Sequence, residues 1–138
     1  MNHKAFSTYR PLFVSLSLYI ASLALPAFIL EHHSPATGLD VLLIGWLGVL
    51  RLNLAWWANP TYLAATVFFV SRSYQRSTWL CLFAFLVSWQ SFAAIGYPLD
   101  ESGLFPITQV VLGFYVWVAS FAVLGVSSAL RYRQAVSA

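Results

Sequence analysis

The sequence predicts an all-α polytopic membrane protein, with four transmembrane helices and a broken or re-entrant segment before the second. Of the 138 residues, 60% are hydrophobic and only 8% are charged, against roughly 25% charged residues in a soluble domain. The apolar residues form long runs, which are typical of membrane-crossing helices when they exceed about 18 residues. Basic residues flank these runs in a pattern that indicates orientation. We therefore predict one helical membrane domain over residues 1–138.

The first predicted crossing is the apolar run 11–30. Its twenty residues would extend about 30 Å as a helix, which is enough to span a bilayer. Pro26 removes a backbone donor and is expected to bend the last turn. A secretory signal is the competing interpretation, but its apolar region is usually about 7–15 residues long.

The stretch 41–71 is too long for one ordinary crossing. Its 31 residues would make a helix of about 46 Å, against a hydrocarbon core of about 30 Å. We expect a break at Asn59–Pro60, because Asn is a preferred N-cap and Pro a preferred first helical residue. The second crossing would then cover residues 60–74. Residues 39–57 would be re-entrant or interfacial, and one strongly kinked helix is the alternative.

Residues 78–97 and 106–130 form the last two predicted crossings, with Pro106 in a first helical turn. Four crossings place all the flanking basic residues on one side, which is cytoplasmic by the positive-inside rule: Lys4, Arg10, Arg72, Arg76, Arg131 and Arg133. The acids then lie outside: Glu31, Asp40, Asp100 and Glu101. The prediction is a multi-pass protein of a bacterial inner membrane, with both termini in the cytoplasm. Because orientation accounts for the net charge of +3, no nucleic-acid partner is expected.

Arg51 is the first candidate for a ligand or interaction site, because it is a basic residue deep within an apolar run. Such a residue is expected to face protein, water or a headgroup. It either binds an anion or pairs with Glu31 or Asp40, or it reaches the outer headgroups with its flexible side chain. Gly45 and Gly48 are candidates on the same helical side, where glycine allows close backbone approach.

Three further candidates come from the break in the long stretch. Asn59 is polar at the expected break, and Trp56 and Trp57 suit a membrane interface, where an indole ring is half wet. Gln90 is expected to form hydrogen bonds between helices.

No metal, cofactor or catalytic site is expected. His32 and His33 are adjacent, so their side chains diverge, and a solvated loop is the expected role of this segment. Cys81 is the only cysteine and is expected to pack as a small apolar residue. The sequence contains no HExxH, phosphate-binding loop or dinucleotide fingerprint.

Two stretches of the sequence resemble small bacterial inner-membrane proteins of unknown function. They are Trp57-Ala58-Asn59-Pro60 and Gly113-Phe114-Tyr115-Val116-Trp117-Val118-Ala119-Ser120. The resemblance implies a bacterial helical membrane protein and brings no activity or ligand with it.

The function expected from the sequence is non-enzymatic. The protein would sit in the lipid bilayer and act by contact with a larger membrane partner, as an accessory or immunity-type protein. The alternative is a small transporter or channel subunit that assembles as a homo-oligomer, because transporters bind substrates at interrupted helices. A membrane enzyme using His32 and His33 is a third, weaker interpretation.

Overall fold

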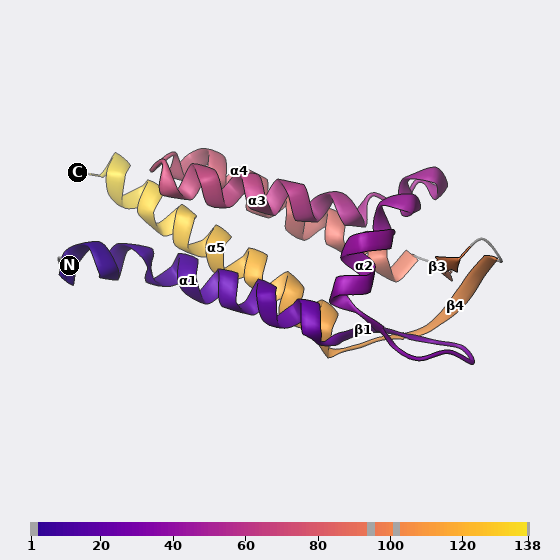
Figure 1. The fold of residues 1–138 in the computed structure, drawn as a ribbon. Coiled ribbons are helices and arrows are strands. Elements are labelled where there is room, and N and C mark those ends of the chain that lie inside the picture. Colours follow the sequence, from indigo (N-terminus) through magenta and orange to yellow (C-terminus); the bar gives the residue numbers. More distant parts are fainter. Residues whose placement is uncertain (1–2, 94–95, 101–102, 138) are drawn as a thin grey trace.

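The computed structural model describes residues 3–93, 96–100 and 103–137. Side chains are described within these ranges except at residues 3–8, 49, 51, 93, 96–100 and 103–105. A helical bundle carries an antiparallel sheet at one end (Figure 1). In chain order the elements are α1 (His3–Ala24), β1 (Pro26–Leu30), β2 (Ala36–Thr37), α2 (Gly38–Ile44), η1 (Gly45–Arg51), η2 (Ala55–Trp57), α3 (Ala58–Val70), α4 (Tyr74–Ser88), η3 (Trp89–Ala93), β3 (Gly96–Asp100), β4 (Gly103–Val110) and α5 (Leu112–Val136).

Aromatic rings form the centre of the bundle, in which α5 packs against both α1 and α4, and α3 packs against α4. Tyr62 of α3 is fully buried. Its ring centroid lies 5.0 Å from that of Tyr19 on α1 and 5.0 Å from that of Phe121 on α5. The three rings therefore join three helices that are far apart in the sequence.

Buried serines add hydrogen bonds to this core. Ser15 Oγ of α1 donates to the Ser120 carbonyl of α5 over 2.7 Å and lies 2.6 Å from the Tyr62 hydroxyl. Ser77 Oγ of α4 donates to the Ala65 carbonyl of α3 over 2.9 Å. The fully or almost fully buried serines are Ser15, Ser22, Ser77, Ser88, Ser120 and Ser128.

The four strands form one sheet in the order β2-β1-β4-β3, and each neighbouring pair is antiparallel. In the central pair, Phe28 of β1 is opposite Val110 of β4, and Leu30 is opposite Ile107. Phe28 and Leu30 are buried, and α2 packs on them through Val41 and Ile44. The sheet therefore closes the end of the bundle that lies away from both chain termini (Figure 1).

The predicted all-α fold with four transmembrane helices is wrong. Among the described residues, only α5, Leu112–Val136, is long and apolar enough to cross a membrane by length and composition. Helices α3 and α4 have 13 and 15 residues, fewer than the roughly 20 that a crossing needs.

Strands account for two of the errors in the predicted crossings. Residues 26–30 and 106–110 were expected in helices, but they pair with each other in β1 and β4. Pro26 does not bend α1, because α1 ends at Ala24 and Pro26 begins β1, a position that tolerates its missing N–H group. Apolar run length was misleading here, because a buried strand is as apolar as a helix.

The long stretch 41–71 is interrupted, but not at Asn59–Pro60. It is divided into α2, η1, η2 and α3, and the irregular residues 52–54 separate η1 from η2. Leu52 has a left-handed backbone, with φ of 60°. Helix α3 begins at Ala58, so Asn59 and Pro60 lie in its first turn, where backbone N–H groups need no helical partner.

Basic residues gather at the end of the bundle opposite the sheet. The termini and the α3–α4 turn share that end (Figure 1). The Arg131 guanidinium of α5 lies 5.7 Å from the Phe69 ring centroid and 5.9 Å from that of Tyr74, which places it at the turn. Glu31 and Asp40 follow β1 and β2 at the sheet end, so charge of opposite sign lies at the two ends.

Candidate binding cavity

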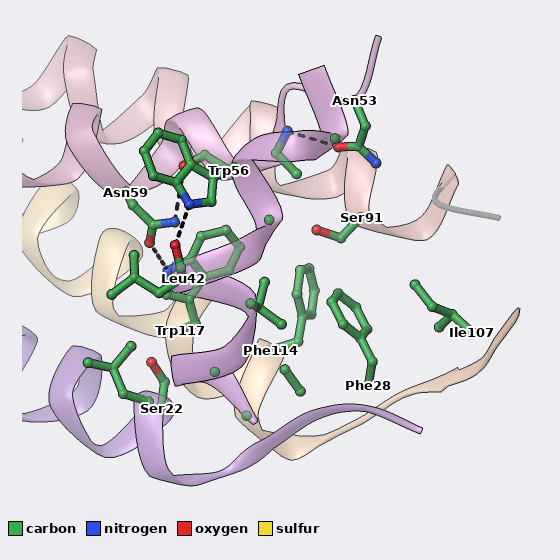
Figure 2. Close-up of a pocket in the computed structure, with 18 residues that line it drawn as sticks. Ser22, Phe28, Leu42, Asn53, Trp56, Asn59, Ser91, Ile107, Phe114 and Trp117 are labelled. Atoms are coloured by element: carbon green, nitrogen blue, oxygen red, sulfur yellow. Dashed lines mark hydrogen bonds between the residues drawn. The ribbon is translucent and has the colours of Figure 1, made fainter. Parts of the chain in front are cut away.

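A cavity of about 90 Å³ lies where the bundle meets the sheet. The ends of α1 and α2, the start of α3, the start of α5 and strands β1 and β4 all contribute to its lining. Its aromatic walls are Phe28, Trp56, Phe114 and Trp117, and its polar side chains are Ser22, Asn53, Asn59 and Ser91. Figure 2 shows these side chains arranged around the central space.

Asn59 forms the main polar junction of the cavity wall and is 5% exposed. Its Oδ1 accepts hydrogen bonds from the Tyr19 hydroxyl of α1 and from Trp117 Nε1 of α5, each over 2.9 Å. Its Nδ2 donates to the Trp56 carbonyl over 3.0 Å. The amide of α3 is therefore bonded to α1 and α5 through its oxygen. One of its two N–H groups is bonded to η2 (Figure 2).

Trp56 fixes the position of α2 and η1 over the cavity. Its Nε1 donates to the Leu42 carbonyl over 2.8 Å. A Cβ atom added at Gly45 would lie 3.0 Å from Trp56 Cδ1, which is closer than most real contacts. Glycine at position 45 therefore allows the indole ring to lie against the backbone.

The irregular residues 52–54 are held by the side chain and backbone of Gln90. Leu54 N donates to Gln90 Oε1 over 2.7 Å, and Asn53 Nδ2 donates to the Gln90 carbonyl over 3.1 Å. Gln90 was expected in the middle of a crossing, but it lies in η3, after α4 has ended. Gln90 therefore connects the irregular residues 52–54 at the rim of the cavity to η3. It does not connect two long helices, as was expected.

Ser91 is a polar group of the cavity with no local partner. The residue is 6% exposed, and within the described part of the chain its Oγ atom forms no hydrogen bond. Figure 2 shows the hydroxyl directed toward the side of the cavity where Asn59 and Trp117 lie. Because a buried hydroxyl normally has a hydrogen-bond partner, this group is available to a bound molecule.

The structure brings four of the sequence-predicted candidates together. Gly45, Gly48, Trp56 and Asn59 all line the cavity. Asn59 does so from inside α3 and not from a break in the chain.

The other candidates lie elsewhere. Trp57 is 49% exposed, and Glu31 lies in the loop after β1, 3.6 Å from the His32 imidazole. Asp40 caps α2, because its Oδ2 accepts from Thr37 N over 2.8 Å and from Thr37 Oγ1 over 2.7 Å. Arg51 is the last residue of η1, and its side chain lies outside the described residues.

The sequence did not indicate Ser22, Ser91, Phe114 or Trp117 as site residues. Phe114 and Trp117 lie in the stretch Gly113–Ser120. Gly113, in the same stretch, allows α5 to start against β1, because an added Cβ atom would lie 2.5 Å from the Pro26 carbonyl oxygen. Nothing local marks Ser91, since its position depends on how η3 follows α4.

Chemically, the cavity suits binding of a neutral group. Among the described residues that line it, none carries a charged side chain. The described residues likewise contain no group of three or more His, Cys, Asp or Glu side chains placed to hold a metal ion. The chain matches no protein-family model, no curated protein and no solved structure.

Proposed function

We propose that the protein is a non-enzymatic integral protein of a bacterial inner membrane, which acts by contact with a larger membrane-protein partner. Its distribution of side chains supports a lipid environment. Buried serines form hydrogen bonds between helices beside the aromatic core, while large apolar side chains such as Ile20, Val67 and Val126 are at least 60% exposed. Small hydrogen-bonding residues between helices, with apolar residues outside, are typical of helices in lipid, where no hydrophobic force drives helices together.

Helix α5 supports the same proposal. Its 25 residues extend about 38 Å, which exceeds the roughly 30 Å of a hydrocarbon core. Only 39% of its most apolar window is buried, whereas a core helix of a soluble protein would be mostly buried. The basic end of the bundle would face the cytoplasm, since Lys and Arg collect on that side, and the sheet would face outward.

The single observation that carries the partner contact is an apolar stripe along α2 and η1. We call Leu39, Leu43 and Trp46 the α2 stripe; each is between 47% and 63% exposed. They recur every three or four residues, while Val41 and Ile44 pack on the sheet. Apolar anchors at this spacing are the pattern by which a helix is recognised in a groove of another protein.

Site-specific photocrosslinking in cells tests this contact. A benzophenone amino acid at Leu43 or Trp46 is expected to give one discrete adduct with a larger protein. The same amino acid at Val126, an exposed position of α5, serves as the matched control and is expected to give no such band. Adducts with lipid alone from the α2 stripe, or the same protein band from Val126, would contradict the proposal. A product of twice the chain mass would identify a second copy as the partner instead of a larger protein.

A further inference from the structure

We propose that the cavity binds a small neutral carbonyl group, either in a free ketone or at the end of a larger membrane-soluble molecule. This inference does not depend on the partner contact proposed above, because it rests on the cavity lining alone. Three properties of that lining define the ligand, namely its size, its neutrality and its hydrogen-bond donors.

The volume limits the ligand to a few heavy atoms. The cavity holds about 90 Å³, while an apolar cavity of about 150 Å³ accommodates benzene. By this comparison a group of about four heavy atoms fits, such as the end of a methyl ketone. The aromatic walls Phe28, Phe114 and Trp117 provide apolar contact for the carbon atoms of such a group.

Neutrality follows from the same lining. No described residue of the cavity wall carries a charge, and a charged ligand that enters an apolar site without a counter-charge pays a large desolvation cost. A carboxylate or an amine is therefore a poor occupant, whereas a ketone enters with only one polar atom to satisfy.

Two hydrogen-bond donors select the carbonyl oxygen. The Ser91 hydroxyl is 6% exposed and has no partner among the described residues. Asn59 Nδ2 has two hydrogens and gives one to the Trp56 carbonyl, while Asn59 Oδ1 already accepts two bonds. The Ser91 hydroxyl can donate or accept, whereas the remaining hydrogen of Asn59 Nδ2 can only donate. An oxygen acceptor on the ligand would therefore satisfy both groups.

The experiment uses the full-length protein in lipid nanodiscs and compares two probes of the same shape. Acetone carries the carbonyl oxygen, and 2-methylpropene replaces that oxygen with a CH₂ group. Binding is followed by the NMR shifts of the Trp56 and Trp117 indole N–H groups, which lie in the cavity wall. We expect saturable shifts, with acetone binding about fivefold more tightly, as one hydrogen bond provides.

Two variants and one longer probe complete the test. Ser91→Ala is expected to remove most of the preference for the ketone while retaining the apolar contact. Ser71→Ala, which removes an exposed hydroxyl at the α3–α4 turn, is the matched control and should keep that preference. 2-Dodecanone, a methyl ketone with a decyl chain, distinguishes the two sources. Much tighter binding of this probe identifies the end of a membrane-soluble molecule, and equal binding identifies a free ketone.

Three results would overturn the inference. One is the absence of saturable shifts with any probe, which would leave the cavity to water. The second is equal affinity for the two matched probes in the unmodified protein, which would make the cavity a purely apolar space. The third is an unchanged preference in Ser91→Ala, provided that its thermal unfolding matches that of the unmodified protein.

Discussion

Trp117 Nε1 donates a hydrogen bond to Asn59 Oδ1 over 2.9 Å, although the two residues are 58 positions apart in the chain. Asn59 lies in the stretch Trp57–Pro60, and Trp117 lies in the stretch Gly113–Ser120. The two stretches therefore meet at the wall of the cavity. Their side chains hold α3 against α5 at the point where the bundle meets the sheet.

Replacing Asn59 with Leu is expected to lower the free energy of unfolding by about 2 kcal/mol, because buried donors then lose their acceptor. Those donors are the Tyr19 hydroxyl and Trp117 Nε1. Denaturant titration in mixed micelles measures the change. Thr61→Val is the control, since Thr61 Oγ1 donates an exposed hydrogen bond to the carbonyl of Trp57, four residues earlier in the chain. Equal stability of the two variants would show that the Asn59 junction contributes nothing.

Replacing Gly125 with Leu is expected to separate α4 from α5. An added Cβ atom at this position would lie 2.9 Å from Cys81 Cβ, and overpacking of this kind typically costs about 1–3 kcal/mol. The Cys81 thiol, 2% exposed in the native protein, should then react faster with a thiol reagent. Val126→Leu, at the neighbouring exposed position, should leave the rate unchanged. A slow, native-like rate in Gly125→Leu would mean that the helices do not approach closely there.

Replacing Gln90 with Ala is expected to loosen residues 52–54 without unfolding the bundle. The Leu54 amide loses the acceptor that it contacts over 2.7 Å, so its hydrogen exchange should accelerate several-fold while the amides of α3 are unaffected. Gln109→Ala, at an exposed site of β4, is the matched control. Acceleration throughout α3 would indicate that Gln90 supports the whole bundle and not only the cavity rim.

Cysteine labelling in spheroplasts tests the proposed orientation. In a Cys81→Ala background, Ser34→Cys at the exposed sheet end should react with an impermeant maleimide. Gln75→Cys, exposed at the start of α4, should react only after lysis. The physical reason is the collection of Lys and Arg at the cytoplasmic face. Ready labelling of Gln75→Cys in intact spheroplasts would reverse the orientation.

Local signals in the sequence were informative where the structure depends on neighbouring residues. The basic residues that flank the apolar runs lie at the end of the bundle opposite the sheet (Figure 1). Gly45 and Trp56 were both predicted as candidate site residues. They contact each other in the structure because glycine leaves space for the indole ring. The predicted N-cap at Asn59 is wrong, because Trp57 is the N-cap of α3 and no side chain caps that end, although Asn59 and Pro60 do lie in the first turn.

The sheet was not predictable from the same signals. Pairing of Phe28 with Val110 depends on contacts between distant residues, and a buried strand has no apolar periodicity that separates it from a short buried helix. The cavity was missed for a related reason. Its lining combines Ser22, Ser91 and Trp117 from three helical elements, and only the finished fold brings these residues together.

Pairing of β1 with β4 also constrains how the protein is made. Thr108 Oγ1 of β4 contacts the Ile29 carbonyl of β1 over 3.1 Å and across 79 residues. During translation, α3 and α4 emerge as neighbours and can associate early, whereas β1 must wait until the ribosome has produced β4. Contacts with such long sequence separation form late, because closing the intervening loop costs entropy first. A nascent chain stalled before residue 110 would thus hold its helical hairpin but not the cavity.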